Sequence, residues 1–401
     1  MAKPECLGAA VTEAEAPLPE HLAPYDRPKI DTSLPISQVA IVTLAQLNPR
    51  PRLGPALRVM SGRPAGQFVF LDVGARSGGE SYCAPLAGQL KVIGFDDSAA
   101  EECQPGDPAA IQYEHHSTIV AGQHGRGKFF KAAWPFASSL HKANMEYFDR
   151  LPCRDNMVVV EELDVETTTL DRFAQGLSDD HIDFIKIDVE GAELEVLRAG
   201  SSMLQDKRVL GIKTEFWWDP ILRGQPSFAE LDIFLRANGF YLFDLEMHNY
   251  QAYMRGSLPA GRLLADSRNW RGVLQNVRSD RSRYGQALTG DALYFRDPVS
   301  DRISGRSTSS WDTASVLRLC ALFDIFDYGD CAIEVLQDFQ QHGALDLNFD
   351  VEAVIDALTP DVRVGSDDSV VLSYKKYRSI SEDVRKRMDK EQRAAVLGPS
   401  A

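Results

Sequence analysis

Several features that mark common protein classes are missing from this 401-residue chain. No apolar run approaches the roughly 18 residues of a membrane span, and the N-terminus lacks the basic and apolar regions of a signal peptide. The six cysteines show no Cys-x-x-Cys pair and no metal-ligand spacing, so we expect reduced thiols and a cytoplasmic location. The net charge of −15 argues against a nucleic-acid partner, because neutralising phosphates needs clustered Lys and Arg.

Composition divides the chain into four expected parts. Prolines are concentrated near the start among Ala and Glu, a composition that cannot bury a core. Alternating strand and helix patterns follow, which predict a doubly wound α/β domain with a parallel sheet. The later residues show helical spacing instead. The expected parts are a mobile arm (1–36), an α/β domain (37–300), a C-terminal helical appendage (301–375) and a charged tail (376–401).

Short apolar runs and helical patterns locate the individual elements. Beyond a first strand near residue 68, we expect strands over residues 91–95, 117–121, 158–162, 182–187, 209–216, 240–245 and 292–295. The appendage is expected to form helices over residues 314–326, 331–341 and 351–358.

The most informative stretch is FVFLDVGARSGGES at residues 68–81, an apolar run followed by a glycine-rich turn. A strand, such a turn and a helix, here expected over residues 80–87, open the nucleotide-binding half of doubly wound folds. The spacing is acid-x-Gly-x-x-x-Gly rather than Gly-x-Gly-x-x-Gly. The Asp72 carboxylate would repel a pyrophosphate but suits the ammonium and sulfonium of S-adenosylmethionine. We favour a methyl-donor site over a dinucleotide site or a turn without ligand. The residues expected to build the donor site are Asp72, Gly74, Arg76, Ser77 and Gly78.

Two acids follow the next expected strand, about one helix and one strand after Asp72. Asp96, with Asp97 beside it, occupies the usual place of an acid that accepts hydrogen bonds from ribose hydroxyls. Both candidate ligands contain this ribose, so Asp96 supports an adenosine site without choosing between them. Gln123 is a candidate for hydrogen bonding to the adenine amino group, with an ordinary polar turn as an equal alternative.

A second informative stretch, IDFIKIDVEGAELE at residues 182–195, reads as a buried strand that ends in acids. Strand alternation puts Lys186 and Asp188 on one face, and a buried Lys is costly unless paired. We expect Glu215, late in the next strand, to be its partner. Ligands of open α/β sheets bind at the carboxyl ends of the strands, which makes Lys186, Asp188 and Glu215 catalytic candidates. A purely structural ion pair is the alternative, and Mg²⁺ held by Asp188, Glu190 and Glu215 is the less favoured one.

These stretches resemble those of the FkbM-type methyltransferases, a branch of the S-adenosylmethionine-dependent class. The likeness runs from residue 68 to about 245 and rests on FLDVGARSGGES, VIGFDDS, SSL at 138–140, TTTLDRF, DFIKIDVEGAELEVLRAG and TEF at 214–216. It implies a Rossmann-like, seven-stranded sheet, an S-adenosylmethionine cofactor and O-methylation of a sugar, glycolipid or polyketide-like metabolite. The family usually has an acid followed by Pro where this chain has Asp96-Asp97-Ser98, and often has His in place of Ala192.

The acceptor is expected to be a small molecule or glycan. Arg residues, among them Arg268 and Arg271, gather with aromatics just before the last expected strand. We expect an insertion at about 250–290 to bind an anionic or glycosylated acceptor, with a solvated surface loop as the alternative. Ser138 and Ser139 are candidate ligand contacts. Oligomerisation is left open.

The sulfonium is already an activated leaving group, so alignment of the acceptor oxygen is the main task, and a general base adds to it. Glu215 and Asp188 are the favoured bases, ahead of His248. Two other functions stay open. One is a non-catalytic methyltransferase-like module that binds the donor or a partner. The other is a nicotinamide-dependent oxidoreductase, for which we find no hydride-transfer centre.

Overall fold

A computed structural model of the chain describes most of the residues between 47 and 372. The described residues are 47–48, 51–59, 66–75, 81–97, 111–149, 154–178, 181–206, 209–250, 286–308, 310–343, 345–346, 350–359, 362–364 and 370–372. All of them belong to one compact unit, Val42–Ala401. The expected arm (1–36), most of the expected insertion (250–290) and the charged tail (376–401) lie outside the described residues.

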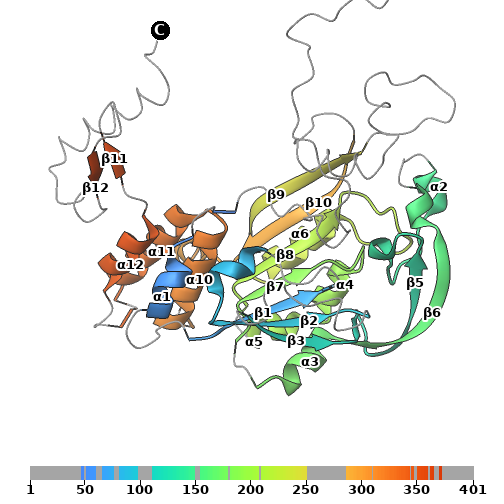
Figure 1. Cartoon of the computed structure of the whole chain (residues 1–401), viewed down its shortest axis with the longest axis horizontal. Coiled ribbons are helices and arrows are strands. Elements are labelled where there is room, and N and C mark those ends of the chain that lie inside the picture. Colours follow the sequence, from blue (N-terminus) through green and yellow to red (C-terminus); the bar gives the residue numbers. More distant parts are fainter. Residues whose placement is uncertain are drawn as a thin grey trace, which may run out of the picture. The chain divides into compact units, whose positions relative to one another are not determined.

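A seven-stranded sheet organises this unit (Figure 1). In their order across the sheet the strands are β3 (Gln112–His116), β2 (Leu90–Phe95), β1 (Phe68–Val73), β7 (Phe184–Ile187), β8 (Gly211–Trp217), β10 (Gln286–Phe295) and β9 (Tyr241–Tyr250). The first five are paired in parallel, and β10 runs antiparallel to both β8 and β9. The predicted doubly wound α/β sheet is confirmed.

The central strands are buried on both faces, which explains their continuous apolar sequences. Every residue of β1 and of β7 is buried. Ile185 and Ile187 pack in one core cluster while Phe184 packs in the other. This alternation places Lys186 and Asp188 on the Phe184 face, as the sequence predicts.

Helices cover both faces of the sheet (Figure 1). The face that contains Ile185 packs against α3 (Leu170–Gly176), α4 (Glu193–Arg198), α5 (Ser201–Asp206) and α6 (Phe228–Ala237). The face that contains Phe184 packs against α1 (Leu53–Val59), the 3-10 helix η3 (Ser81–Leu86), α9 (Pro298–Ile303), α10 (Thr313–Ile325), α11 (Gly329–Gln341) and α12 (Val351–Leu358).

The C-terminal helices are therefore part of the sheet's own core. Their bounds lie within two residues of the predicted ones. The side chains of Asp312 and Asp350 cap α10 and α12 by accepting hydrogen bonds from backbone N–H groups in the first turn. Phe326, just after α10, stacks on Phe184 of the central strand with ring centroids 5.2 Å apart. These helices cover most of the sheet face that contains Phe184, because η3 is too short to cover it alone.

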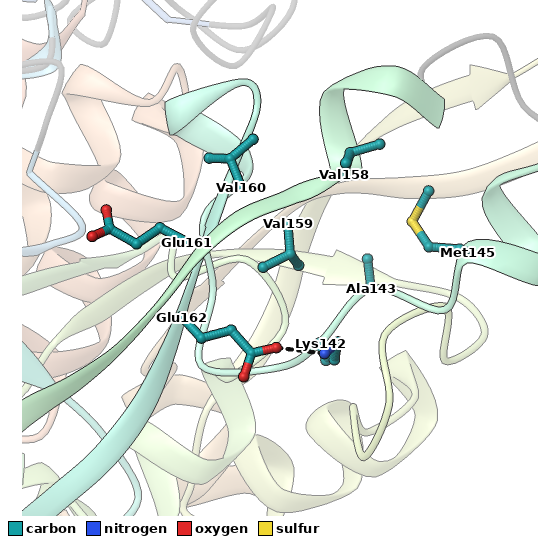
Figure 2. A pocket seen from close by; sticks show the side chains of 8 residues that line it. All are labelled: Lys142, Ala143, Met145, Val158, Val159, Val160, Glu161 and Glu162. Atoms are coloured by element: carbon teal, nitrogen blue, oxygen red, sulfur yellow. Dashed lines mark hydrogen bonds and ion pairs between the residues drawn. The ribbon is translucent and has the colours of Figure 1, made fainter.

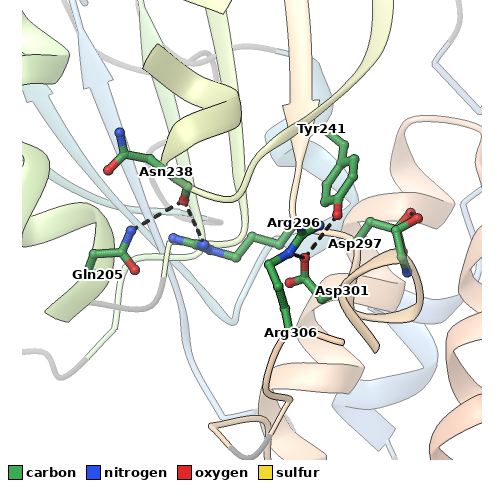
Figure 3. A network of polar contacts seen from close by, with 8 residues as sticks. Gln205, Asn238, Tyr241, Arg296, Asp297, Asp301 and Arg306 are labelled. Carbon is green, nitrogen blue, oxygen red and sulfur yellow. Dashed lines mark hydrogen bonds and ion pairs between the residues drawn. The ribbon is translucent and has the colours of Figure 1, made fainter. Parts of the chain in front are cut away.

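Buried polar contacts stabilise the sheet just before β7 and just after β10. Arg318 of α10 pairs with Asp183, just before β7, at 2.7 Å, and the Asp183 carboxylate also accepts a hydrogen bond from Val69 N at 2.8 Å. Just after β10, Arg296 donates to the backbone carbonyl of Asn238 (Figure 3) and also to the carbonyls of Val209 and Leu204. Burial lowers the pKa of Arg296 to about 10. Both residues are structural.

A smaller sheet stands beside the large one. Its strand order is β4 (Ile119–Val120), β6 (Val159–Thr168) and β5 (Gly125–Ala132). Three short helices lie between its strands in the sequence: η5 (Pro135–Ala137), α2 (Met145–Phe148) and η6 (Arg154–Met157). Elsewhere in the chain, α12 is followed by a hairpin of β11 (Val362–Val364) and β12 (Val370–Leu372). A third apolar cluster joins this sheet to the end of β8 through Phe148, Trp217 and Leu222.

One predicted element is wrong. Residues 117–121 do not form the third strand of the large sheet, because β4 pairs with β6 in the smaller one. The third strand is β3, a half-exposed edge strand of sequence QYEHH whose polar residues hide it from an apolar search. The helical segment predicted over residues 80–87 is present as the 3-10 helix η3, which contains Pro85 and is not an α-helix. Proline lacks the N–H that an α-helix needs there.

Candidate functional site

Lys186 joins the carboxyl ends of the two central strands. Its ammonium lies 3.2 Å from Asp72 Oδ1 and 3.6 Å from Asp188 Oδ2, and it donates a hydrogen bond to Gly74 O at 2.9 Å. The sequence predicts Glu215 as the partner of Lys186; the structure places Asp72 and Asp188 there instead. The reason is the parallel pairing of β1 with β7, which aligns Asp72 with Lys186. The ammonium of Lys186 therefore offsets the negative charge of Asp72.

Gly74 brings the glycine bend against the end of β7. Its φ is +85°, and a Cβ added there would collide with the carbonyl oxygen of Asp188. Only glycine meets both requirements. The bend is fixed on its other side by hydrogen bonds from Gly74 N and Ala75 N to Phe95 O, at 2.9 and 3.0 Å. The ends of β1, β2 and β7 are therefore held together at one point.

The predicted donor-binding residues divide into those that the structure describes and those that it does not. Asp96 and Asp97 are half-buried at the end of β2, directly after Phe95, and so lie next to the glycine bend. Gln123 is exposed in the turn between β4 and β5, where its carbonyl accepts a hydrogen bond from Thr167 Oγ1 at 2.8 Å. Arg76, Ser77 and Gly78 lie outside the described residues.

Acidic side chains gather beside this bend. Asp188, Glu190 and Glu215 each bring a carboxylate oxygen within 4.8 Å of the other two. Asp291 of β10 aligns with Glu215 across the sheet. Burial, and then the charges of Glu190 and Asp188, hold the pKa of the Glu215 carboxyl well above its ordinary value. The predicted candidates Lys186, Asp188 and Glu215 thus lie in one neighbourhood at the carboxyl edge of the sheet.

The turn after β7 is held in an uncommon conformation. Glu190 has a φ of +56°, a region that non-glycine residues seldom occupy. Glu193 stabilises the turn, because its Oε1 accepts hydrogen bonds from Val189 N at 3.2 Å and Gly191 N at 2.9 Å. Ser139 Oγ donates to Glu190 O at 2.6 Å. Burial raises the pKa of Glu193 to about 7.

The sequence does not predict three residues that lie near these acids. Glu193 reads there as an ordinary first-turn acid of a helix, and Asp291 as part of a distant strand. The third, His141, contacts Glu195 of α4, with Nε2 3.4 Å from Oε1, and its Nδ1 lies 2.9 Å from Arg223 O. The hydrogen bond with Glu195 raises the pKa of His141. Ser139, a predicted ligand contact, donates a hydrogen bond to Glu190 O and accepts one from His141 N. Its position in the sequence is the signal that could have pointed to His141.

A separate hollow of about 340 Å³ lies over the smaller sheet (Figure 2). Its lining comes from β6, from residue 158 before it and from the segment 142–145, and Lys142 pairs there with Glu162 at 2.5 Å. None of the predicted site residues lines this hollow. It is therefore distinct from the neighbourhood of Lys186.

The large sheet and the edge around Lys186 define a class. A parallel sheet whose last pair contains one antiparallel strand, with a glycine bend after β1 and acids after β2 and β7, is the fold of S-adenosylmethionine-dependent methyltransferases. Residues 72–242 match the model of the methyltransferase FkbM domain. This match agrees with the resemblance to the FkbM-type methyltransferases that the sequence shows.

Two solved structures are similar to the chain at a low level. One is magnesium protoporphyrin IX methyltransferase from Synechocystis PCC 6803 with bound SAM, at 13% identity and a TM-score of 0.26, covering 61% of this chain and 77% of that one. The other is an arsenic(III) S-adenosylmethionine methyltransferase from Chlamydomonas reinhardtii, at 12% identity and a TM-score of 0.26, covering 61% and 73%. At these scores neither carries an argument about the site.

A comparison with curated proteins finds no match to the chain. Within the described residues, every helix is too short or too polar to cross a membrane.

Proposed function

We propose that the protein transfers a methyl group from S-adenosylmethionine to a hydroxyl of a sugar, glycolipid or polyketide-like metabolite. The observation that carries this proposal is the arrangement around Lys186. A single ammonium fixes the glycine bend after β1 and the acid after β7, and the acidic cluster lies directly beside them. Ligands of open α/β sheets bind at this edge.

The donor would lie along the glycine bend. The backbone of Gly74, together with Arg76, Ser77 and Gly78, would surround its methionine part, and Asp96 and Asp97 would accept hydrogen bonds from the ribose. Gln123 would reach the adenine. Among the described residues, Asp72 and Asp188 both pair with Lys186, which sets two carboxylates beside one ammonium at this corner. Such a corner favours the ammonium and sulfonium of the donor over a diphosphate.

The chemistry then requires alignment and the removal of one proton. The acceptor oxygen forms a bond to the methyl carbon while the carbon–sulfur bond breaks, and the electron pair goes to sulfur, which becomes a neutral thioether. Alignment contributes at most roughly 7–11 kcal/mol. We assign the hydroxyl proton to Glu215 or Asp188. The raised pKa of Glu215 brings this carboxyl nearer to the range of a working base. Lys186 acts as a positioning residue.

The acceptor is proposed to be a small molecule or glycan with anionic character, bound by the Arg-rich segment that lies outside the described residues. Incubation of the full chain with methyl-labelled donor and fractionated small-molecule and glycan extracts tests this. We expect label in a carbohydrate or polyketide fraction with wild-type protein, and less than one hundredth of that label with Glu215→Gln. Label that appears equally with both proteins would remove Glu215 from the reaction. Donor binding without any label would favour a non-catalytic module.

A further inference from the structure

The three carboxylates at the carboxyl edge have the arrangement of a cation site. Asp188, Glu190 and Glu215 come from the end of β7, the turn after it and β8, yet their ligand atoms lie within 4.8 Å of one another. Charges of one sign at this spacing repel, and the repulsion is stronger away from bulk water. Carboxylate oxygens are the ligands that Mg²⁺ and Mn²⁺ prefer.

An independent observation concerns a single atom, Glu215 Oε2. It is buried, and among the described residues no donor hydrogen-bonds to it. The neighbouring Thr289 hydroxyl is 3.4 Å from the other oxygen, Oε1, but 2.5 Å from Phe216 O, which takes its only proton. A buried oxygen without a partner requires an explanation, and an ion is one of the few available.

The second ligand is held in place before anything binds. Glu190 keeps its φ of +56° because Ser139 Oγ and Glu193 Oε1 fix the turn on both sides. Such strain persists only where the surroundings impose it, and it gathers at sites of function. Asp188 has two carboxylate oxygens, so it can pair with Lys186 through one and bind a cation through the other.

We propose that Asp188, Glu190 and Glu215 bind one divalent cation, Mg²⁺ or Mn²⁺, which holds the oxygens of the methyl acceptor. Three carboxylate oxygens leave the remaining positions of an octahedral ion for water and for two neighbouring acceptor oxygens. The acceptor would then be a vicinal diol or a hydroxyl next to a carbonyl or carboxylate. This role in orienting the acceptor rests on the proposed function, whereas the cation site itself does not.

The cation changes where the hydroxyl proton goes. A hydroxyl bound to a divalent cation loses its proton more readily, so water can take it without a carboxylate base. The acceptor oxygen then bonds to the methyl carbon as the carbon–sulfur bond breaks, and sulfur keeps the electron pair. Glu215 and Asp188 act in this scheme as ligands, which separates it from their assignment as general bases.

Titration of the full chain with Mn²⁺, followed by the electron paramagnetic resonance signal of the free ion, tests the site directly. We expect one saturable site per chain that Mg²⁺ displaces, with at least tenfold weaker binding in Glu215→Gln and in Glu190→Gln. The exposed Glu166 of β6 offers a matched control, and Glu166→Gln should bind as the wild type does. Absence of a saturable site in the wild type, or unchanged binding in both site variants, would overturn the inference.

Thermal unfolding adds a second readout that a misfolded variant cannot imitate. Removing one of three repelling charges should raise the melting temperature of Glu215→Gln without cation, and Mg²⁺ should raise that of the wild type but not that of the variant. A variant that melts lower than the wild type and still responds to Mg²⁺ would contradict the site.

Donor binding, measured on the same sample by calorimetry with S-adenosylhomocysteine, separates the two proposals. Cation binding without heat from S-adenosylhomocysteine would remove the proposed function and support the cation site. Heat from S-adenosylhomocysteine, with methyl transfer unchanged by EDTA, would support the proposed function and overturn the cation's role.

Discussion

The two ends of the central strand β7 treat buried charge in opposite ways. At its start, Asp183 is fully buried, pairs with Arg318 and accepts a hydrogen bond from the backbone of β1. At its end, one lysine serves two aspartates, and Glu190 and Glu215 add further negative charge in a strained turn. At the first end the buried carboxylate has a cation as its partner, which serves the fold. Among the described residues, the second end gathers several carboxylates around one lysine, an arrangement typical of a binding site.

The largest expected effect lies at the start of β7. Arg318→Ala leaves the buried Asp183 carboxylate without its cation, and we expect a loss of about 3–5 kcal/mol in the free energy of unfolding. Urea titration measures it. Arg302, whose pair with Asp338 is more exposed, is the matched control, and Arg302→Ala should cost much less. Equal losses would erase the contrast between the two ends.

The next effect is a pH dependence at the carboxyl end. Burial raises the pKa of Glu193 from 4.5 to about 7, so the folded state holds this proton more tightly than the unfolded state does. Its contribution to stability is complete below pH 4.5 and is lost as the pH rises through 7, about 3 kcal/mol in all. Glu193→Gln can still accept the two backbone N–H groups of the turn.

The variant should therefore gain stability over the wild type as the pH rises from 4.5 to 7. Urea unfolding of both proteins at several pH values checks this. Parallel stability profiles for the two proteins would show that the pKa of Glu193 is the same in the folded and unfolded states.

A smaller change in stability, with a large change in activity, is expected for Lys186→Met. The variant removes the ion pair with Asp72 and the hydrogen bond to Gly74 O, which costs about 1–3 kcal/mol. Because the glycine bend loses its anchor, affinity for S-adenosylhomocysteine should fall at least tenfold by calorimetry. Lys91→Met is the control, since Lys91 pairs with Glu114 on the same sheet away from the bend. Retention of full affinity by Lys186→Met would make Lys186 purely structural.

The smallest expected effect concerns the strained turn. Ser139→Ala removes the hydrogen bond to Glu190 O and should cost about 0.5–1.5 kcal/mol. Ser138→Ala loses a comparable bond, from Ala132 N, that does not involve Glu190. Stability should therefore fall similarly in both variants, while the acceptor KM rises only in Ser139→Ala. A matching rise in Ser138→Ala would trace the effect to the loop as a whole.

The fold was predictable because its signals are local. Apolar strands such as β1 and β7, and helices such as α12, show their periodicity directly in the sequence. The edge strand β3 does not, since half-exposed strands have no apolar run, and Pro85 changes a helix type through one missing N–H.

The site was predictable only in part. Lys186, Asp188 and Glu215 lie in one neighbourhood because strand ends meet at one edge. The partner of Lys186 depends on which residues are aligned between β1 and β7, and the approach of Asp291 to Glu215 depends on the strand order. Neither register nor strand order is written in a local pattern.

The central claim is that the edge around Lys186 selects a cationic nucleoside over a diphosphate one. Isothermal titration calorimetry of the full chain with S-adenosylhomocysteine and S-adenosylmethionine, and with NAD in parallel, tests it most directly. We expect saturable heat from the first two and none from NAD. Tight binding of NAD, with no heat from either methionine nucleoside, would contradict it.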